Sequence, residues 1–161
     1  MRKSLVLVAA LLAAPAVAKD LPDTAIAFGL WTGGAATDAT GAYSHCYASL
    51  SYSNGESIWV NVTKDERVEL VFVFPTLSLT PGQELDASLM METGVPSYGK
   101  ALAIDAKTVS FSLAPLHDAH VMLAQGNWIR LTGVGNDLAY EVRGLGGVLG
   151  LVRSCAEKQR G

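Results

Sequence analysis

The sequence predicts a mainly β fold, in which one β-sandwich or barrel-like domain is completed by a short helix and by a C-terminal helix packed on it. Short apolar stretches alternate with turn residues from residue 25 onward, a pattern typical of all-β domains. The chain of 161 residues is 50% hydrophobic and 17% charged, which suits one hydrophobic core. The spacing of an amphipathic helix is confined to two stretches in the second half of the chain.

The first 18 residues have the pattern of a secretory signal peptide. Arg2 and Lys3 precede a short apolar run, and Ala16-Val17-Ala18 supplies a small-residue cleavage site. The run is shorter than the roughly 20 residues that span a bilayer, so we expect removal and no transmembrane segment afterwards. Removal of Arg2 and Lys3 leaves 10 of the 12 Lys and Arg residues against 15 Asp and Glu. The predicted mature domain, residues 19–161, is therefore mildly acidic and lacks the cationic surface that binds nucleic acid.

The first strand is predicted over residues 26–33, and the Ala- and Thr-rich residues 34–41 are expected to form a loop. Residues 46–53 and 56–63 then form a hairpin, because Asn54-Gly55 between them tolerates the positive φ angles of a tight turn. In the second arm polar and apolar residues alternate. The apolar set predicted to face the core is Ile58, Val60 and Val62.

Residues 67–74 form the next predicted strand, and both of its faces are largely apolar. A central strand, or one covered by a helix, has this pattern. Pro81-Gly82 interrupts the chain before a strand over 86–92, which ends at Gly94-Val95-Pro96. Residues 100–105 and 108–113 are then expected to pair across a short turn.

A short helix is predicted over residues 115–125, with Pro115 in the first turn and Gly126 as a stop. A last hairpin joins residues 127–134 to 138–143. Residues 146–158 are predicted to form the C-terminal helix, because apolar residues recur with a spacing of three and four. Its predicted buried stripe consists of Leu145, Val148, Leu149, Val152 and Cys155.

The two cysteines, Cys46 and Cys155, are predicted to form a disulfide, because exported chains meet oxidising machinery and an even number of cysteines usually pairs. Such a bond would tie the C-terminal helix to the start of a strand. Two buried free thiols remain the alternative, and metal binding by two distant cysteines is disfavoured.

Several short pieces of the chain resemble the exported proteins of the invasion-associated locus B type. The pieces are Trp31, His45-Cys46-Tyr47, Trp59, Trp128, residues 142–146 and residues 148–155. The resemblance implies a periplasmic or secreted β-rich domain with one disulfide, associated with the envelope or with host interaction. It implies no established catalytic site.

The sequence lacks four common catalytic and cofactor-binding motifs. It contains no Gly-x-Ser-x-Gly elbow, no phosphate-binding glycine loop before a helix, no Cys-x-x-Cys and no His-Glu-x-x-His. His117, Asp118 and His120 form one local cluster on the predicted short helix. Two imidazoles make an incomplete zinc site, so we expect a solvated polar face there, and neither a metal nor a cofactor.

Recognition is expected in loops held by the β scaffold, namely residues 34–44 and 93–99. Tyr43 and Tyr98 offer aromatic anchors there. The wider set of Trp and Tyr residues is expected mainly in the core, with a ligand cup as the alternative. His45 is expected to point away from the face that holds Cys46, because neighbouring residues of a strand alternate.

Three classes of function remain open. The sequence favours a non-enzymatic binding protein of the cell envelope, whose partner is a protein or another envelope component. A periplasmic carrier of a small ligand, with an open barrel interior, is the second class. A secreted enzyme whose residues come together only in the fold is the third.

Overall fold

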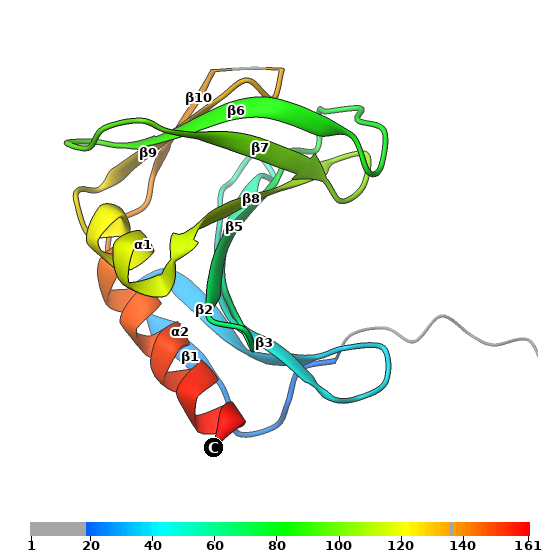
Figure 1. The fold of residues 1–161 in the computed structure, drawn as a ribbon, viewed down its shortest axis with the longest axis vertical. Coiled ribbons are helices and arrows are strands. Elements are labelled where there is room, and N and C mark those ends of the chain that lie inside the picture. The colour runs from blue at the N-terminus through cyan, green and yellow to red at the C-terminus, as the bar shows by residue number, and fades with distance from the viewer. Residues whose placement is uncertain (1–18, 136) are drawn as a thin grey trace, which may run out of the picture.

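The computed structural model describes residues 19–135 and 137–161, and there ten strands form one antiparallel sheet (Figure 1). The order across the sheet is β1-β2-β3-β4-β5-β8-β7-β6-β9-β10. The elements are β1 (Ile26–Phe28), β2 (Trp31–Thr37), β3 (Tyr43–Ser51), β4 (Ser57–Thr63), β5 (Arg67–Val73), β6 (Glu84–Met91), β7 (Ser97–Ala103), β8 (Thr108–Pro115), α1 (Leu116–Leu123), β9 (Trp128–Thr132), β10 (Leu138–Glu141) and α2 (Leu145–Arg160). The predicted mainly β class, with a short and a C-terminal helix, is confirmed. The predicted signal peptide, residues 1–18, lies outside the described residues.

The sheet is strongly curved, and both helices lie on one side of it (Figure 1). One wall is built from β1 to β5 and the other from β6, β7, β9 and β10, and β8 joins the two by pairing with β5 and β7. Helix α2 packs across β1 to β4, and α1 contacts α2, β5 and β8. A cluster of buried apolar residues fills the space between the sheet and the helices. No helix in the described part of the chain is long and apolar enough to cross a bilayer.

The hairpin of β3 and β4 forms as its sequence predicts. Ile58, Val60 and Val62 are fully buried, as alternation of side chains along a strand requires. The turn between the strands places Gly55 at a φ of 84°, and Asn54 Oδ1 accepts a hydrogen bond from the Glu56 amide. Strand β5 is central, as predicted, because it lies between β4 and β8.

The prediction for the N-terminal part of the sheet is wrong in two places. Residues 26–33 do not form one strand, because the chain turns at Gly29, with a φ of 60°, and divides into β1 and β2. Residues 34–37, predicted as the start of a loop, belong to β2 and pair with β3. They are buried because small side chains let other segments approach closely. The Ala35 amide donates to Thr24 Oγ1, and the Ala35 carbonyl accepts from the Leu21 amide.

The remaining predicted elements are present, with ends that differ by a few residues. The predicted strand over 100–105 ends earlier, because Ile104 already belongs to the turn, where its amide donates to the Thr108 carbonyl. Pro115 is the last residue of β8, so the short helix begins at Leu116. Residues 142 and 143 lie beyond β10. The turn after β9 includes residue 136, which is outside the described residues.

Helix α2 is fixed to the sheet by packing and by the predicted disulfide. Leu145, Val148, Leu149, Val152 and Ala156 are buried, and Cys155 is partly buried beside them. Cys155 is bonded to Cys46 of β3, with the two Cα atoms 6.1 Å apart. The prediction of this disulfide is confirmed. The segment that leads into α2 is held as well, because the indole of the buried Trp31 donates to the Arg143 carbonyl.

Candidate binding face

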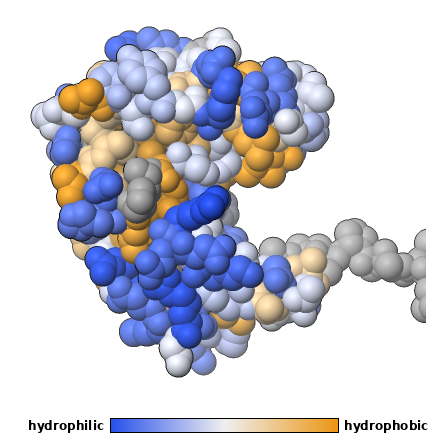
Figure 2. All heavy atoms as spheres, viewed as in Figure 1, coloured by the Kyte–Doolittle hydropathy of each residue, from blue (hydrophilic) through white to orange (hydrophobic). Residues whose placement is uncertain are grey.

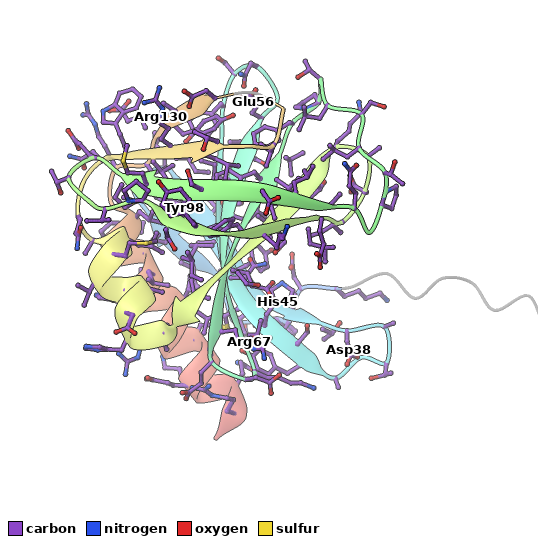
Figure 3. All side chains as sticks on the ribbon, turned by 45° about the horizontal axis from the view of Figure 1, so that its top comes forward. Asp38, His45, Glu56, Arg67, Tyr98 and Arg130 are labelled. Carbon is purple, nitrogen blue, oxygen red and sulfur yellow. A yellow bond between two sulfur atoms is a disulfide. The ribbon has the colours of Figure 1, made fainter. Side chains whose placement is uncertain are left out.

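The side of the sheet opposite the core carries a patch of polar and aromatic residues that we call the outer face. These residues alternate with core residues along β3, β4, β5 and β8. The outer face consists of His45, Tyr47, Ser49, Trp59, Asn61, Glu69, Val71 and Ser110. In outline the molecule is a C, with a hollow between the wall that contains β6 and β7 and the β2–β3 hairpin (Figure 2). His45 is labelled between these two parts in Figure 3.

Strand register brings the outer-face residues into two rows across the sheet. Tyr47 lies opposite Asn61, which lies opposite Glu69. In the second row Ser49 lies opposite Trp59, Trp59 opposite Val71, and Val71 opposite Ser110. Neighbouring strands lie about 4.8 Å apart, so the four strands β3, β4, β5 and β8 span roughly 14 Å. The outer face is therefore wide enough to contact a chain of several units.

An aromatic pair lies where the two rows meet. The ring centroids of Tyr47 and Trp59 are 5.1 Å apart, with the ring planes tilted by 31°. The Tyr47 hydroxyl donates to Asp20 Oδ1 at 2.8 Å, and Trp59 Nε1 donates to Ser57 Oγ at 3.0 Å. Burial and this hydrogen bond to Asp20 raise the pKa of Tyr47 to about 12, so the phenol keeps its proton at neutral pH. Both rings are held at their polar edges.

His45 lies next to this pair, with its ring centroid 6.0 Å from that of Tyr47. Burial lowers the pKa of the imidazole, and the carboxylate of Asp20 offsets only part of this effect. His45 Nδ1 and Ser44 Oγ share a hydrogen bond of 3.1 Å. Cys46 points to the core, so the predicted alternation of His45 and Cys46 is confirmed. At neutral pH the outer face thus presents an uncharged imidazole.

Asn61 has an unsatisfied polar atom. Its Oδ1 is buried and has no hydrogen-bond partner among the described residues. A buried acceptor without a donor costs about 1–3 kcal/mol relative to one that is paired. The residue lies between Tyr47 and Glu69 in the row described above. An unpaired amide oxygen is therefore placed beside the aromatic pair.

The structure places the two predicted anchors, Tyr43 and Tyr98, far apart. Tyr43 is the first residue of β3 and is partly buried, with its hydroxyl 3.7 Å from Cys46 Sγ. Burial raises the pKa of its phenol. Tyr98 lies on β7 and is 80% exposed, beside the ion pair of Lys100 and Asp86. Strands β4, β5 and β8 separate the two residues.

The predicted binding loops are shorter than expected. Thr37 is paired with Tyr43, so the loop that was predicted over residues 34–44 covers only 38–42. Residues 97–99 belong to β7, which shortens the second predicted loop to 92–96. The predicted loop boundaries are wrong because strand pairing extends into the small and polar residues at both sites. The outer face lies on the strands, outside both predicted loops.

The histidine cluster lies on α1. His117 and Asp118 are exposed, and His120 is partly exposed, with a buried Nδ1 that has no hydrogen-bond partner in the part of the chain that the structure describes. In the described ranges no group of three or more His, Cys, Asp or Glu side chains is arranged to hold a metal ion. The expectation that this segment binds no metal remains a prediction.

The tryptophans have three different environments. Trp31 is buried in the core at 1% exposure, Trp59 lies on the outer face, and Trp128 is 46% exposed on β9. Inside the curved sheet, Phe72 and Phe74 pack against Tyr140. The aromatic residues therefore do not gather around one internal cup. Those of the outer face form a separate group on the opposite side of the sheet.

Neither a protein-family model, nor a curated protein, nor a solved structure matches this chain. The fold and the outer face define a disulfide-bonded β domain with a candidate binding surface. Membership of the invasion-associated locus B type remains a prediction from the short sequence pieces.

Proposed function

We propose that the protein is an exported, non-enzymatic binding protein that attaches to a component of the cell envelope through its outer face. The observation that carries the proposal is the Tyr47–Trp59 pair, whose polar edges are hydrogen-bonded within the protein. Side chains that are already fixed lose little conformational entropy when a partner binds. The disulfide and the predicted signal peptide support an oxidising location outside the cytoplasm.

The polar groups of the outer face favour binding over catalysis. A hydroxyl does contact an imidazole, at Ser44 and His45, but the two residues are neighbours in one strand. The nearby carboxylate of Asp20 accepts its hydrogen bond from Tyr47. A nucleophile needs a base that is in turn oriented by a third group. His45 thus has Ser44 as its hydrogen-bond partner, and within the described ranges no carboxylate is hydrogen-bonded to its ring.

The core supports a binding face over an internal carrier site. Leu70, Phe72 and Phe111 occupy the interior of the curved sheet and are buried. They belong to the same cluster as the buried side of α2. A carrier that holds its ligand inside a barrel needs an interior space in this position.

Co-sedimentation with isolated envelopes of the producing cells tests the proposed function. Trp59→Ala should abolish sedimentation with the envelope fraction. Trp128→Ala removes another partly exposed indole from the opposite wall and should bind as the unaltered protein does. Urea unfolding must show both variants folded. Equal binding by Trp59→Ala, or turnover of an envelope substrate by the unaltered protein, would overturn the proposal.

Tyr98→Ala provides a second comparison. Tyr98 is the more exposed of the two anchors predicted from sequence, and it lies on β7 outside the outer face. We expect this variant to bind normally. Binding lost in Tyr98→Ala but kept in Trp59→Ala would transfer the site to the sequence-predicted position.

A further inference from the structure

The geometry points to an uncharged glycan chain that contains N-acetylhexosamine units as the ligand of the outer face, stacked on the Tyr47–Trp59 pair. This inference rests on the proposed function, because it assigns a ligand class to the same face. It follows from what the rings leave exposed, from the polar groups beside them, and from the charge of the surface.

Tyr47 and Trp59 are both partly exposed, and their polar edges are hydrogen-bonded within the protein. The Tyr47 hydroxyl and Trp59 Nε1 already have acceptors, Asp20 and Ser57. The part of each side chain that has no hydrogen-bond partner is its apolar, electron-rich ring surface. A pyranose ring has a flat face of C–H groups that fits such a surface, and hydroxyls at its edge. The pair thus suits a ligand that is apolar on its face and polar around its rim.

The groups around the pair match that polar rim. Asn61 carries the unpaired Oδ1, and Ser49 and Ser110 lie on either side of Trp59 and Val71 in the same row. The Ser49 hydroxyl donates to the Thr32 carbonyl, so it meets a ligand as an acceptor. Oδ1 is buried in the free protein, so a ligand reaches it only if the Asn61 side chain moves outward. A ligand hydroxyl or amide N–H could then supply the missing donor, which recovers the cost of the unpaired acceptor.

Val71 is the feature that favours an N-acetyl group over a plain hydroxyl. It lies directly opposite Trp59 across β4 and β5, and Val73 follows it on the same side of β5. An acetamido group has a methyl for such a contact and an amide for hydrogen bonds. The methyl can bury apolar area against Val71 while the amide N–H and carbonyl reach Asn61 and the serine hydroxyls.

Charge and composition argue against other macromolecules. Glu69 lies in the outer face and Asp20 accepts a hydrogen bond from Tyr47, so carboxylates flank the aromatic pair, while the exposed Arg67 lies farther along β5, two residues before Glu69. Negative charge beside the pair disfavours a phosphate or a sulfate there. An amphipathic helix would need a continuous apolar groove. The outer face instead alternates polar residues with the aromatic pair. Its width of roughly 14 Å across four strands calls for a chain of sugars rather than one.

Calorimetry with chitohexaose as the probe tests the assignment, with cellohexaose and heparin as comparisons. The purified protein should bind chitohexaose, bind cellohexaose at least tenfold more weakly, and show no binding of heparin. Trp59→Ala should weaken chitohexaose binding at least tenfold. Tyr47→Phe, which keeps the ring, should retain more of the affinity than Tyr47→Ala.

Asn61→Leu separates a ligand contact from a structural role. Leu replaces the amide with an apolar group of similar size, so the protein should unfold at an unchanged or higher urea concentration because the unpaired oxygen is gone. Chitohexaose binding should nevertheless fall at least fivefold. Trp128→Ala, on β9, is the matched control and should leave the affinity unchanged.

The outcomes distinguish this inference from the proposed function. Binding to envelopes that depends on Trp59, without binding of chitohexaose, would overturn the glycan assignment alone and indicate a protein partner. Equal affinity for chitohexaose and cellohexaose would overturn the N-acetyl preference. Absence of Trp59-dependent binding to envelopes would overturn the proposed function, and the glycan assignment would fall with it.

Discussion

Reduction of the disulfide should destabilise the protein by about 4 kcal/mol without changing its folded structure. Cys46 and Cys155 are separated by 109 residues. In the chain-entropy model, a cross-link that closes a loop of about 100 residues lowers the entropy of the unfolded chain by an amount worth about 4.7 kcal/mol. Measured effects usually fall somewhat below the model. The folded state keeps α2 in place through Val148, Leu149 and Val152, which are fully buried.

Urea unfolding of the same protein, oxidised and reduced, measures this difference without any substitution. The midpoint should fall, and the slope m should stay the same or rise, because both folded states bury the same surface while the reduced unfolded chain is free to expand. The double variant Cys46→Ala/Cys155→Ala is the control, and reductant should leave its midpoint unchanged. Alanine is chosen because Cys46 is fully buried, where the hydroxyl of serine would lack a partner.

Two results would refute this reasoning. A difference below about 1 kcal/mol between oxidised and reduced protein would mean that the cross-link does not constrain the unfolded chain as the loop length requires. A lower slope m in the reduced protein would mean that α2 leaves the sheet when the bond opens. The stabilisation would then act through the folded state.

Three further predictions concern single residues. Gly33→Ala should destabilise the protein by more than 2 kcal/mol in urea unfolding, because the added Cβ would lie within 3 Å of backbone atoms of β3. Its control in the same assay is Gly150→Ala, which has open space around it and should raise stability by about 1 kcal/mol. Trp31→Phe should cost about 2 kcal/mol, because it removes the hydrogen bond to the Arg143 carbonyl, and a chevron analysis or equilibrium unfolding would detect it. Burial lowers the pKa of His45 from 6.5, so its contribution to stability should be complete above about pH 6.5 and lost as the pH falls through the lower folded-state pKa. His45→Gln should flatten that part of the stability profile, and an unchanged profile would contradict the assignment.

Local patterns explain which elements could be predicted from the sequence. The β3–β4 hairpin carries strict alternation around Asn54-Gly55, and α2 carries a regular apolar stripe, so neither needs information from distant residues. Strand β2 differs. Its Ala35 and Ala36 have weak β propensity, and they are held in a strand by pairing with β3 and with Asp20. Such tertiary contacts leave no periodic signal in the sequence.

The outer face could be predicted only in part for the same reason. Alternation along β3 and β4 shows that His45, Tyr47 and Trp59 share a face. It does not show that Val71 lies opposite Trp59, since that depends on the register of β4 and β5. It shows still less that Ser110 joins the row, because β8 pairs with β5 after an intervening pair of strands. The proposed binding face is therefore built on strands and lies outside the loops in which recognition was predicted.

Strand β3 carries both the residue that ties down α2 and the residues proposed to bind a ligand. Cys46 points inward to the disulfide, while His45 and Tyr47, on either side of it, point outward. Alternation thus separates stability and binding by one residue along a single strand. Because the disulfide acts mainly on the unfolded chain, reduced protein that remains folded should keep its outer face intact. Its affinity should be unchanged while less of it is folded, so redox conditions should govern the amount of active protein and leave its specificity unaltered.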